Sequence, residues 1–134
     1  MFDLSKLEVK ETSTIHLEGP DGELLFAEDG EKVTVTVYGP GSKQFQKAQG
    51  ARNRAVLELM RKGSKKVRDE DQRSIDSEFL CTCTASFNSM SYEGLVGHEL
   101  TKAIYNNPKL GFIAEQVNRQ INDWSNFTQG SDKT

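Results

Sequence analysis

Alternation of polar and apolar positions dominates the first third of the chain. Residues 14–18 and 32–38 alternate in this way, and the second of these segments is rich in β-branched residues. Residues 23–27, which follow a turn signal, can return antiparallel to residues 14–18. Such alternation is typical of strands with one buried face, and the glycine-containing segments between them are strong turn signals. The pattern therefore predicts a three-stranded antiparallel meander over residues 13–38, with the valines of its last strand on one buried face.

Helical spacing of apolar residues replaces this alternation in the rest of the chain. Ser42 is a candidate N-cap for a first helix that would end near Gly63. Further periodic segments give about four helices between residues 43 and 124. The predicted fold class is thus α+β, with one domain over residues 1–127. Residues 128–134 offer little apolar surface to bury, and we expect them to form a disordered tail.

Two of the predicted helices carry long apolar stripes. The stripes consist of Ile75, Phe79, Cys83 and Phe87 in the second helix and of Ile113, Val117, Ile121 and Trp124 in the last. Because Cys83 lies on such a stripe, we expect it to be a small buried hydrophobe. Cys81 and Cys83 are too close in sequence to connect distant elements, which excludes a disulfide framework.

Composition and charge narrow the function classes. The chain has 134 residues, 35% of them hydrophobic, which suffices for one core. A net charge of -3 and a pI near 5.4 argue against nucleic acid or an anionic membrane as partner. The basic run at residues 61–68 is expected to complement the end of a helix. No apolar run approaches the roughly 18 residues of a membrane span, so we expect a cytoplasmic protein.

Residues with catalytic or metal-binding chemistry are sparse. His16 and His98 are far apart in sequence and lack the spaced carboxylates or cysteines of a zinc site. Residues 39–43 follow a predicted strand, but lack the spacing of a phosphate-binding loop. We therefore expect a protein without enzymatic activity, metal or cofactor. A small enzyme or metal-dependent regulator that uses Cys81, Cys83 and His98 is the most distant alternative.

Several short motifs resemble, in order and spacing, the tail assembly chaperones of long-tailed bacteriophages and prophages. The resemblance extends over residues 1–127. The motifs are Tyr38-Gly39-Pro40-Gly41-Ser42-Lys43-Gln44-Phe45, Tyr92-Glu93-Gly94, residues 100–108 with Ala103, Ile104 and Tyr105, Glu115-Gln116-Val117, and Asp123-Trp124-Ser125-Asn126-Phe127.

The resemblance implies a non-catalytic role in building the phage tail. Such a protein binds the tape measure protein, and in some cases tail tube subunits, in the cytoplasm of the bacterial host. It is absent from the finished virion. The alternative is a structural tail or head-tail component that stays in the virion, which a strand-rich N-terminal part would also suit.

A chaperone of this kind needs apolar residues beyond those that fill its own core. The candidate partner-binding residues are Val96, Phe112, Gln116, Trp124 and Phe127. The four apolar candidates lie off or at the end of their helix stripes, and Gln116 lies within one of the resembling motifs. Copies arranged along a client would also have to self-associate, for which the strand edge of the N-terminal meander is available. We therefore expect a homo-oligomer.

Overall fold

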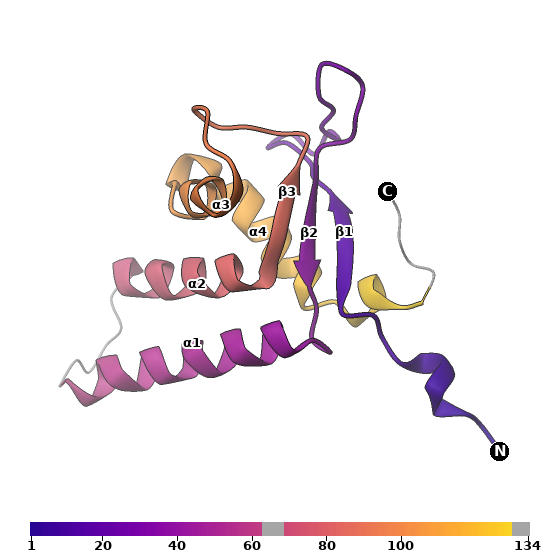
Figure 1. The fold of residues 1–134 in the computed structure, drawn as a ribbon. Coiled ribbons are helices and arrows are strands. Elements are labelled where there is room, and N and C mark those ends of the chain that lie inside the picture. Colours follow the sequence, from indigo (N-terminus) through magenta and orange to yellow (C-terminus); the bar gives the residue numbers. More distant parts are fainter. Residues whose placement is uncertain (63–68, 130–134) are drawn as a thin grey trace.

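Three antiparallel strands and four α-helices make up the fold (Figure 1). The structure is a computed structural model that describes residues 1–62 and 69–129. Strands β1 (Thr12–His16), β2 (Thr34–Tyr38) and β3 (Thr84–Asn88) form one sheet in the order β1-β2-β3. The α+β class predicted from the sequence is confirmed.

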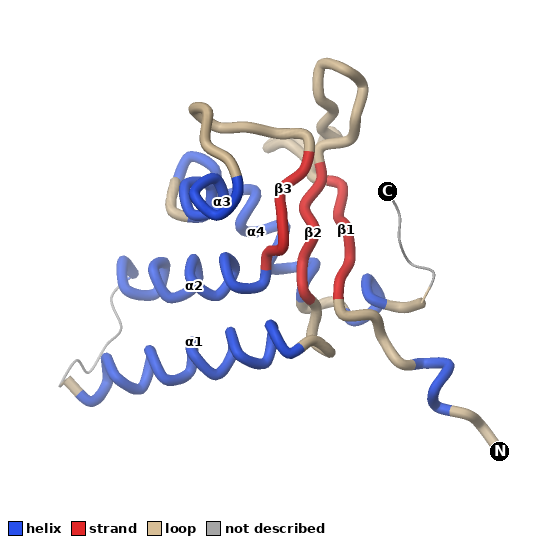
Figure 2. Tube along the Cα trace, in the orientation of Figure 1, coloured by secondary structure: helices blue, strands red, loops and turns tan. Residues whose placement is uncertain are grey.

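The helices cover the sheet from the side of β3. They are α1 (Lys43–Arg61), α2 (Asp69–Cys83), α3 (Gly97–Tyr105) and α4 (Gly111–Ile121), with short 3-10 turns η1 (Leu4–Leu7), η2 (Pro108–Leu110) and η3 (Trp124–Phe127). In the view of Figure 2, α4 passes behind the sheet, where it contacts β2, and α1 runs alongside α2. None of the helices in the described ranges is long and apolar enough to cross a bilayer.

The third strand of the sheet is β3, and not the strand predicted at residues 23–27. β1 pairs directly with β2, with Ile15 opposite Val35, and β3 occupies the other edge of β2. Residues 23–27 form only isolated bridges within the long β1–β2 connection, where the Leu25 amide donates to the Leu17 carbonyl at 3.0 Å. β1 and β3 occupy the two edges of β2, so residues 23–27 do not pair with β2.

Phe87 also differs from its prediction, which placed it in the second helix. Helix α2 ends at Cys83, and the chain then continues as β3, in which Phe87 pairs with Val35. The ring of Phe87 lies 5.5 Å from that of Tyr105. No glycine or proline marks the end of this helix. The change from helix to strand is instead determined by pairing with β2, which is distant in sequence. Apolar spacing of four residues cannot reveal such a change.

The core lies between the sheet and the helices. Val33, Val35 and Val37 are buried on one face, as the alternation predicts. The other buried apolar residues are Leu17, Phe45, Ala48, Phe79, Leu80, Cys83, Leu100, Ile104, Tyr105, Ile113, Val117, Ile121 and Phe127. Cys83 has no exposed surface, which confirms its prediction as a buried residue. Burial raises the pKa of the Cys83 thiol to about 12, so the thiol stays protonated near neutral pH.

The N-cap of the first helix is also confirmed. The hydroxyl of Ser42 accepts a hydrogen bond from the Phe45 amide at 3.1 Å and donates one to the Gly39 carbonyl at 2.7 Å. The predicted helix end near Gly63 and most of the basic run at 61–68 lie outside the described residues. So do residues 130–134 of the predicted tail, whereas the Gln129 side chain donates to the Glu8 carbonyl at 3.1 Å.

Candidate functional site

The five predicted partner-binding residues do not form one surface. Val96 and Trp124 are 76% and 57% exposed, and Phe112 is half-buried against the core. Gln116 and Phe127 are buried in the folded chain, so their side chains offer little surface, and their contact with a partner stays a prediction. Only two of the five side chains offer a large apolar surface to a partner.

Phe127 is buried because it packs against the loop after β2. A Cβ atom at Gly39 would lie only 2.4 Å from the ring, so the close approach requires a glycine there. The Phe127 carbonyl also accepts a hydrogen bond from the Lys10 amide at 2.6 Å. These contacts make Phe127 part of the core. They also join the first and last motifs of the resemblance in one packing unit.

Gln116 connects α4 to the chain that follows β1. Its side-chain amide donates to the Glu18 carbonyl at 2.6 Å, and its side-chain oxygen accepts from the Glu18 amide at 2.8 Å. This pair satisfies the backbone polar groups of Glu18, which has no strand partner on that side of the hydrogen-bond ladder. Gln116 therefore stabilises the fold through these two hydrogen bonds.

Trp124 lies on a rigid turn instead of on the apolar stripe of the last helix. Helix α4 ends at Ile121, and Trp124 begins η3. The Asp123 carboxylate caps this turn by accepting from the Ser125 amide at 3.0 Å and from its hydroxyl at 2.6 Å, which lowers the pKa of Asp123. The Asn126 side chain donates to both the carbonyl and the side-chain oxygen of Gln120. The backbone of the turn that carries the exposed indole is thus held in a defined position.

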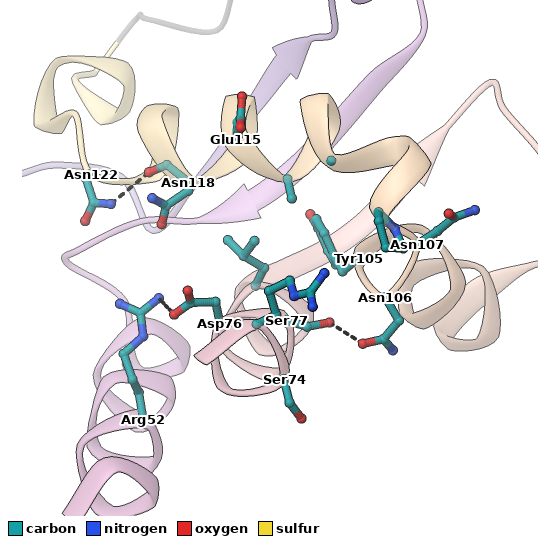
Figure 3. A pocket seen from close by; sticks show the side chains of 15 residues that line it. Arg52, Ser74, Asp76, Ser77, Tyr105, Asn106, Asn107, Glu115, Asn118 and Asn122 are labelled. Carbon is teal, nitrogen blue, oxygen red and sulfur yellow. Dashed lines mark hydrogen bonds and ion pairs between the residues drawn. The ribbon is translucent and has the colours of Figure 1, made fainter. Parts of the chain in front are cut away.

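A cleft of about 880 Å³ lies between α2 and α4 and is closed at one end by α3 and η2 (Figure 3). Polar side chains line it from both helices, among them Arg73 and Ser77 on α2 and Asn118 and Asn122 on α4. Its apolar lining includes Leu80, Tyr105, Pro108, Gly111 and Ala114. None of the five predicted partner-binding residues lines this cleft.

Hydrogen bonds fix part of the cleft lining. The Ser77 hydroxyl donates to the Asn106 side-chain oxygen at 2.7 Å, and the Asn122 side chain donates to the Asn118 carbonyl at 2.8 Å. At the α1 end, an Arg52 guanidinium nitrogen lies 3.4 Å from the Asp76 carboxylate. The same guanidinium stacks over the Phe79 ring at 3.7 Å. The walls of the cleft are thus held in place before any ligand binds.

Two ionisable side chains, Tyr105 and His16, are hydrogen-bonded within the fold. Tyr105 donates to or accepts from the Thr84 hydroxyl at 2.7 Å, and burial raises its pKa, so the phenol is protonated at neutral pH. The His16 Nε2 atom lies 2.7 Å from the Leu25 carbonyl oxygen. Within residues 1–62 and 69–129, no three side chains of His, Cys, Asp or Glu are grouped to hold a metal ion.

A signal for the cleft was present in the sequence. Glu115, Asn118 and Asn122 lie at positions i, i+3 and i+7 and form a polar stripe on α4, away from the stripe of buried apolar residues. Surface helices commonly present charged residues at such positions, and two amides in one stripe are less usual. The pattern could have marked this face of α4, but it does not reveal that α2 stands opposite.

Comparisons with known proteins identified no relative of this chain. No family model and no curated protein matches the sequence, and no solved structure matches the fold. The fold and the site define an α+β protein with an exposed indole on a hydrogen-bonded turn and a polar cleft. Its function is therefore argued from these two features and from the sequence motifs.

Proposed function

We propose that this chain is a non-catalytic tail assembly chaperone of a long-tailed phage or prophage. It binds the tape measure protein, and also tail tube subunits, in the cytoplasm of the bacterial host, and acts as a homo-oligomer. The proposal combines the resemblance of the sequence motifs with one structural observation. That observation is the exposure of Trp124 on a turn fixed by its own hydrogen bonds.

An exposed tryptophan on a rigid turn suits protein recognition. Tryptophan is enriched among the residues that dominate binding energy at interfaces, because a large apolar ring with one polar atom gains much from leaving water. Ordering a flexible side chain or loop on binding costs free energy. The capped η3 turn lowers that cost, since Asp123 and Asn126 hold the backbone of the turn before a partner arrives.

The packing of Phe127 against Gly39 supports the same assignment. The two residues belong to different motifs of the resemblance, residues 38–45 and 123–127. Their contact gives a physical reason for the two motifs to occur together: Gly39 leaves room for the Phe127 ring, and the turn that carries this ring also carries Trp124. Motifs that meet in this way act as one structural unit.

Fluorescence of the purified protein tests the proposal directly, because Trp124 is the only tryptophan of the chain. We expect its emission to shift to the blue when tape measure protein is added, as the indole leaves water. A Trp124→Ala variant should lose most of the tape measure protein in a pull-down. Leu57→Ala is a matched control, because Leu57 is 62% exposed on α1. Capture of the client with an unchanged emission spectrum would exclude Trp124 from the interface.

Mass spectrometry of purified virions separates the proposal from its main alternative. A chaperone is expected to be absent from the particle, whereas a structural tail or head-tail component is retained in amounts comparable to those of the tail proteins. Finding the chain in the virion at such amounts would overturn the chaperone role.

A further inference from the structure

The cleft between α2 and α4 carries hydrogen-bonding groups that the fold leaves unused. Within the described part of the chain, the side chain of Asn118 makes no hydrogen bond, and the side-chain oxygen of Asn122 accepts none. Arg73 also lines the cleft and has no ion-pair partner among the described residues. The cleft therefore presents both donors and acceptors beside an apolar floor.

The spacing of these groups matches an extended polypeptide. Asn118 and Asn122 are one helical turn apart, or about 6 Å along the axis of α4. In an extended chain, backbone groups that point to the same side recur every two residues, at about 6.6–6.8 Å. Amide side chains can both accept from N–H and donate to C=O groups, and an extended segment presents these groups unpaired. A helical ligand has already paired its own backbone groups.

The charges of the cleft favour a polypeptide over an anionic small molecule. Arg73 on α2 and Glu115 on α4 contribute opposite charges, and Arg52 is paired with Asp76. The lining thus has no excess of positive charge with which to select a nucleotide or another phosphate ligand. Apolar residues such as Leu80 and Ala114 can receive aliphatic side chains of a bound peptide.

We propose that this cleft binds an extended segment of the client protein, with the client backbone paired to the amides of α4. The inference rests on the proposed function, because the client is the tape measure protein. A second copy of this chain fits less well. Its exposed apolar residues near the start of the chain, Phe2, Leu4 and Leu7, lie in or beside a 3-10 turn capped by Asp3, which is not extended.

A variant that fills the cleft tests the inference. Gly111 lines the cleft, and a Cβ atom there would meet no other atom within 4 Å, so Gly111→Phe can place its ring in the open space. We expect it to weaken binding of tape measure protein, and of overlapping peptides from it, by roughly tenfold or more. Gly50→Phe is the matched control: Gly50 lies on α1 outside the cleft, and only the Arg54 side chain comes near, at 3.4 Å. Circular dichroism checks that both variants fold.

A second variant removes a hydrogen-bonding group without filling space. Asn118 is exposed, so Asn118→Ala should fold normally and weaken peptide binding by roughly fivefold. If both cleft variants bind as wild type does, the inference is wrong while the proposed function stands. If Gly111→Phe reduces self-association but not client binding, the cleft belongs to a second copy and the inference is also wrong. If the wild-type protein itself binds no tape measure protein, the proposed function fails and the inference falls with it.

Discussion

Trp124 and Phe127 lie three residues apart on the same short turn, yet one is 57% exposed and the other has no exposed surface. Side chains three residues apart nearly eclipse one another in a 3-10 helix, so opposite faces of the turn do not explain the difference. The difference comes from what lies opposite each ring. Phe127 meets Gly39, whose missing side chain leaves room for it. A residue distant in sequence, Gly39, therefore decides which of the two aromatic rings on this turn is buried.

The largest effect should follow from removing the buried ring. Phe127→Ala is expected to lower the free energy of unfolding by about 3–5 kcal/mol, through lost apolar burial and the cavity that remains. Urea denaturation followed by circular dichroism measures the loss. Phe127→Leu, which keeps part of the volume, should lose less. A loss below about 1 kcal/mol for Phe127→Ala would contradict the burial of the ring.

A smaller loss of stability should follow from adding a side chain at Gly39, against which the Phe127 ring packs. Gly39→Ala places a Cβ atom within 2.4 Å of Phe127, and we expect it to cost about 1–3 kcal/mol of stability. Combining it with Phe127→Leu should recover part of the loss, because the two residues are in contact. Gly50→Ala is the control and should not destabilise, since its Cβ meets only the end of a flexible arginine. Purely additive losses in the double variant would show that Gly39 and Phe127 are not coupled.

The cysteine pair provides the same contrast between neighbouring residues and adds a pH dependence. Burial raises the pKa of both thiols, and that of Cys83, which has no exposed surface, rises from 9.0 to about 12. Between these values the unfolded Cys83 thiol loses its proton and the folded one keeps it, so this thiol alone lowers stability as pH rises, by up to about 1.4 kcal/mol per pH unit. The raised pKa values of Cys81 and Tyr105 add to this loss. Urea unfolding across this range measures the slope. Cys83→Ala should reduce the slope, and an unchanged slope would show that Cys83 does not cause it.

The smallest change in stability is expected at the exposed ring. Trp124→Ala should alter the free energy of unfolding by less than about 0.5 kcal/mol, because more than half of the residue is exposed and the turn is held by other residues. The same urea titrations, followed by circular dichroism, provide the value. A loss similar to that of Phe127→Ala would mean that both aromatic residues belong to the core, and the contrast between them would disappear.

Local features of the fold could be predicted from the sequence. The Ser42 cap, the buried valines at positions 33, 35 and 37 and the stripe Ile113, Val117 and Ile121 depend on neighbouring residues and were found where expected. Each is a repeat or a cap of a few residues, and local geometry determines the outcome.

Features that depend on distant segments could not be predicted in this way. The strand at residues 84–88 forms because β2 has a free edge, and residues 23–27 form only isolated bridges in the β1–β2 connection. The burial of Phe127 depends on Gly39, and the cleft depends on where α2 stands relative to α4. Single-sequence periodicity contains no information on such placements.

The contact between Gly39 and Phe127 also has a consequence for folding during synthesis. The face of β2 that Val35 and Val37 bury cannot be fully covered until residue 127 has been made, since Phe127 closes the core beside them. At usual rates of translation, on the order of ten seconds separate the synthesis of β2 from that of Phe127. For much of this interval β3 has not been made, and the Phe127 ring is missing throughout it. The nascent chain is then most exposed to aggregation, and contacts between residues so distant in sequence slow its folding.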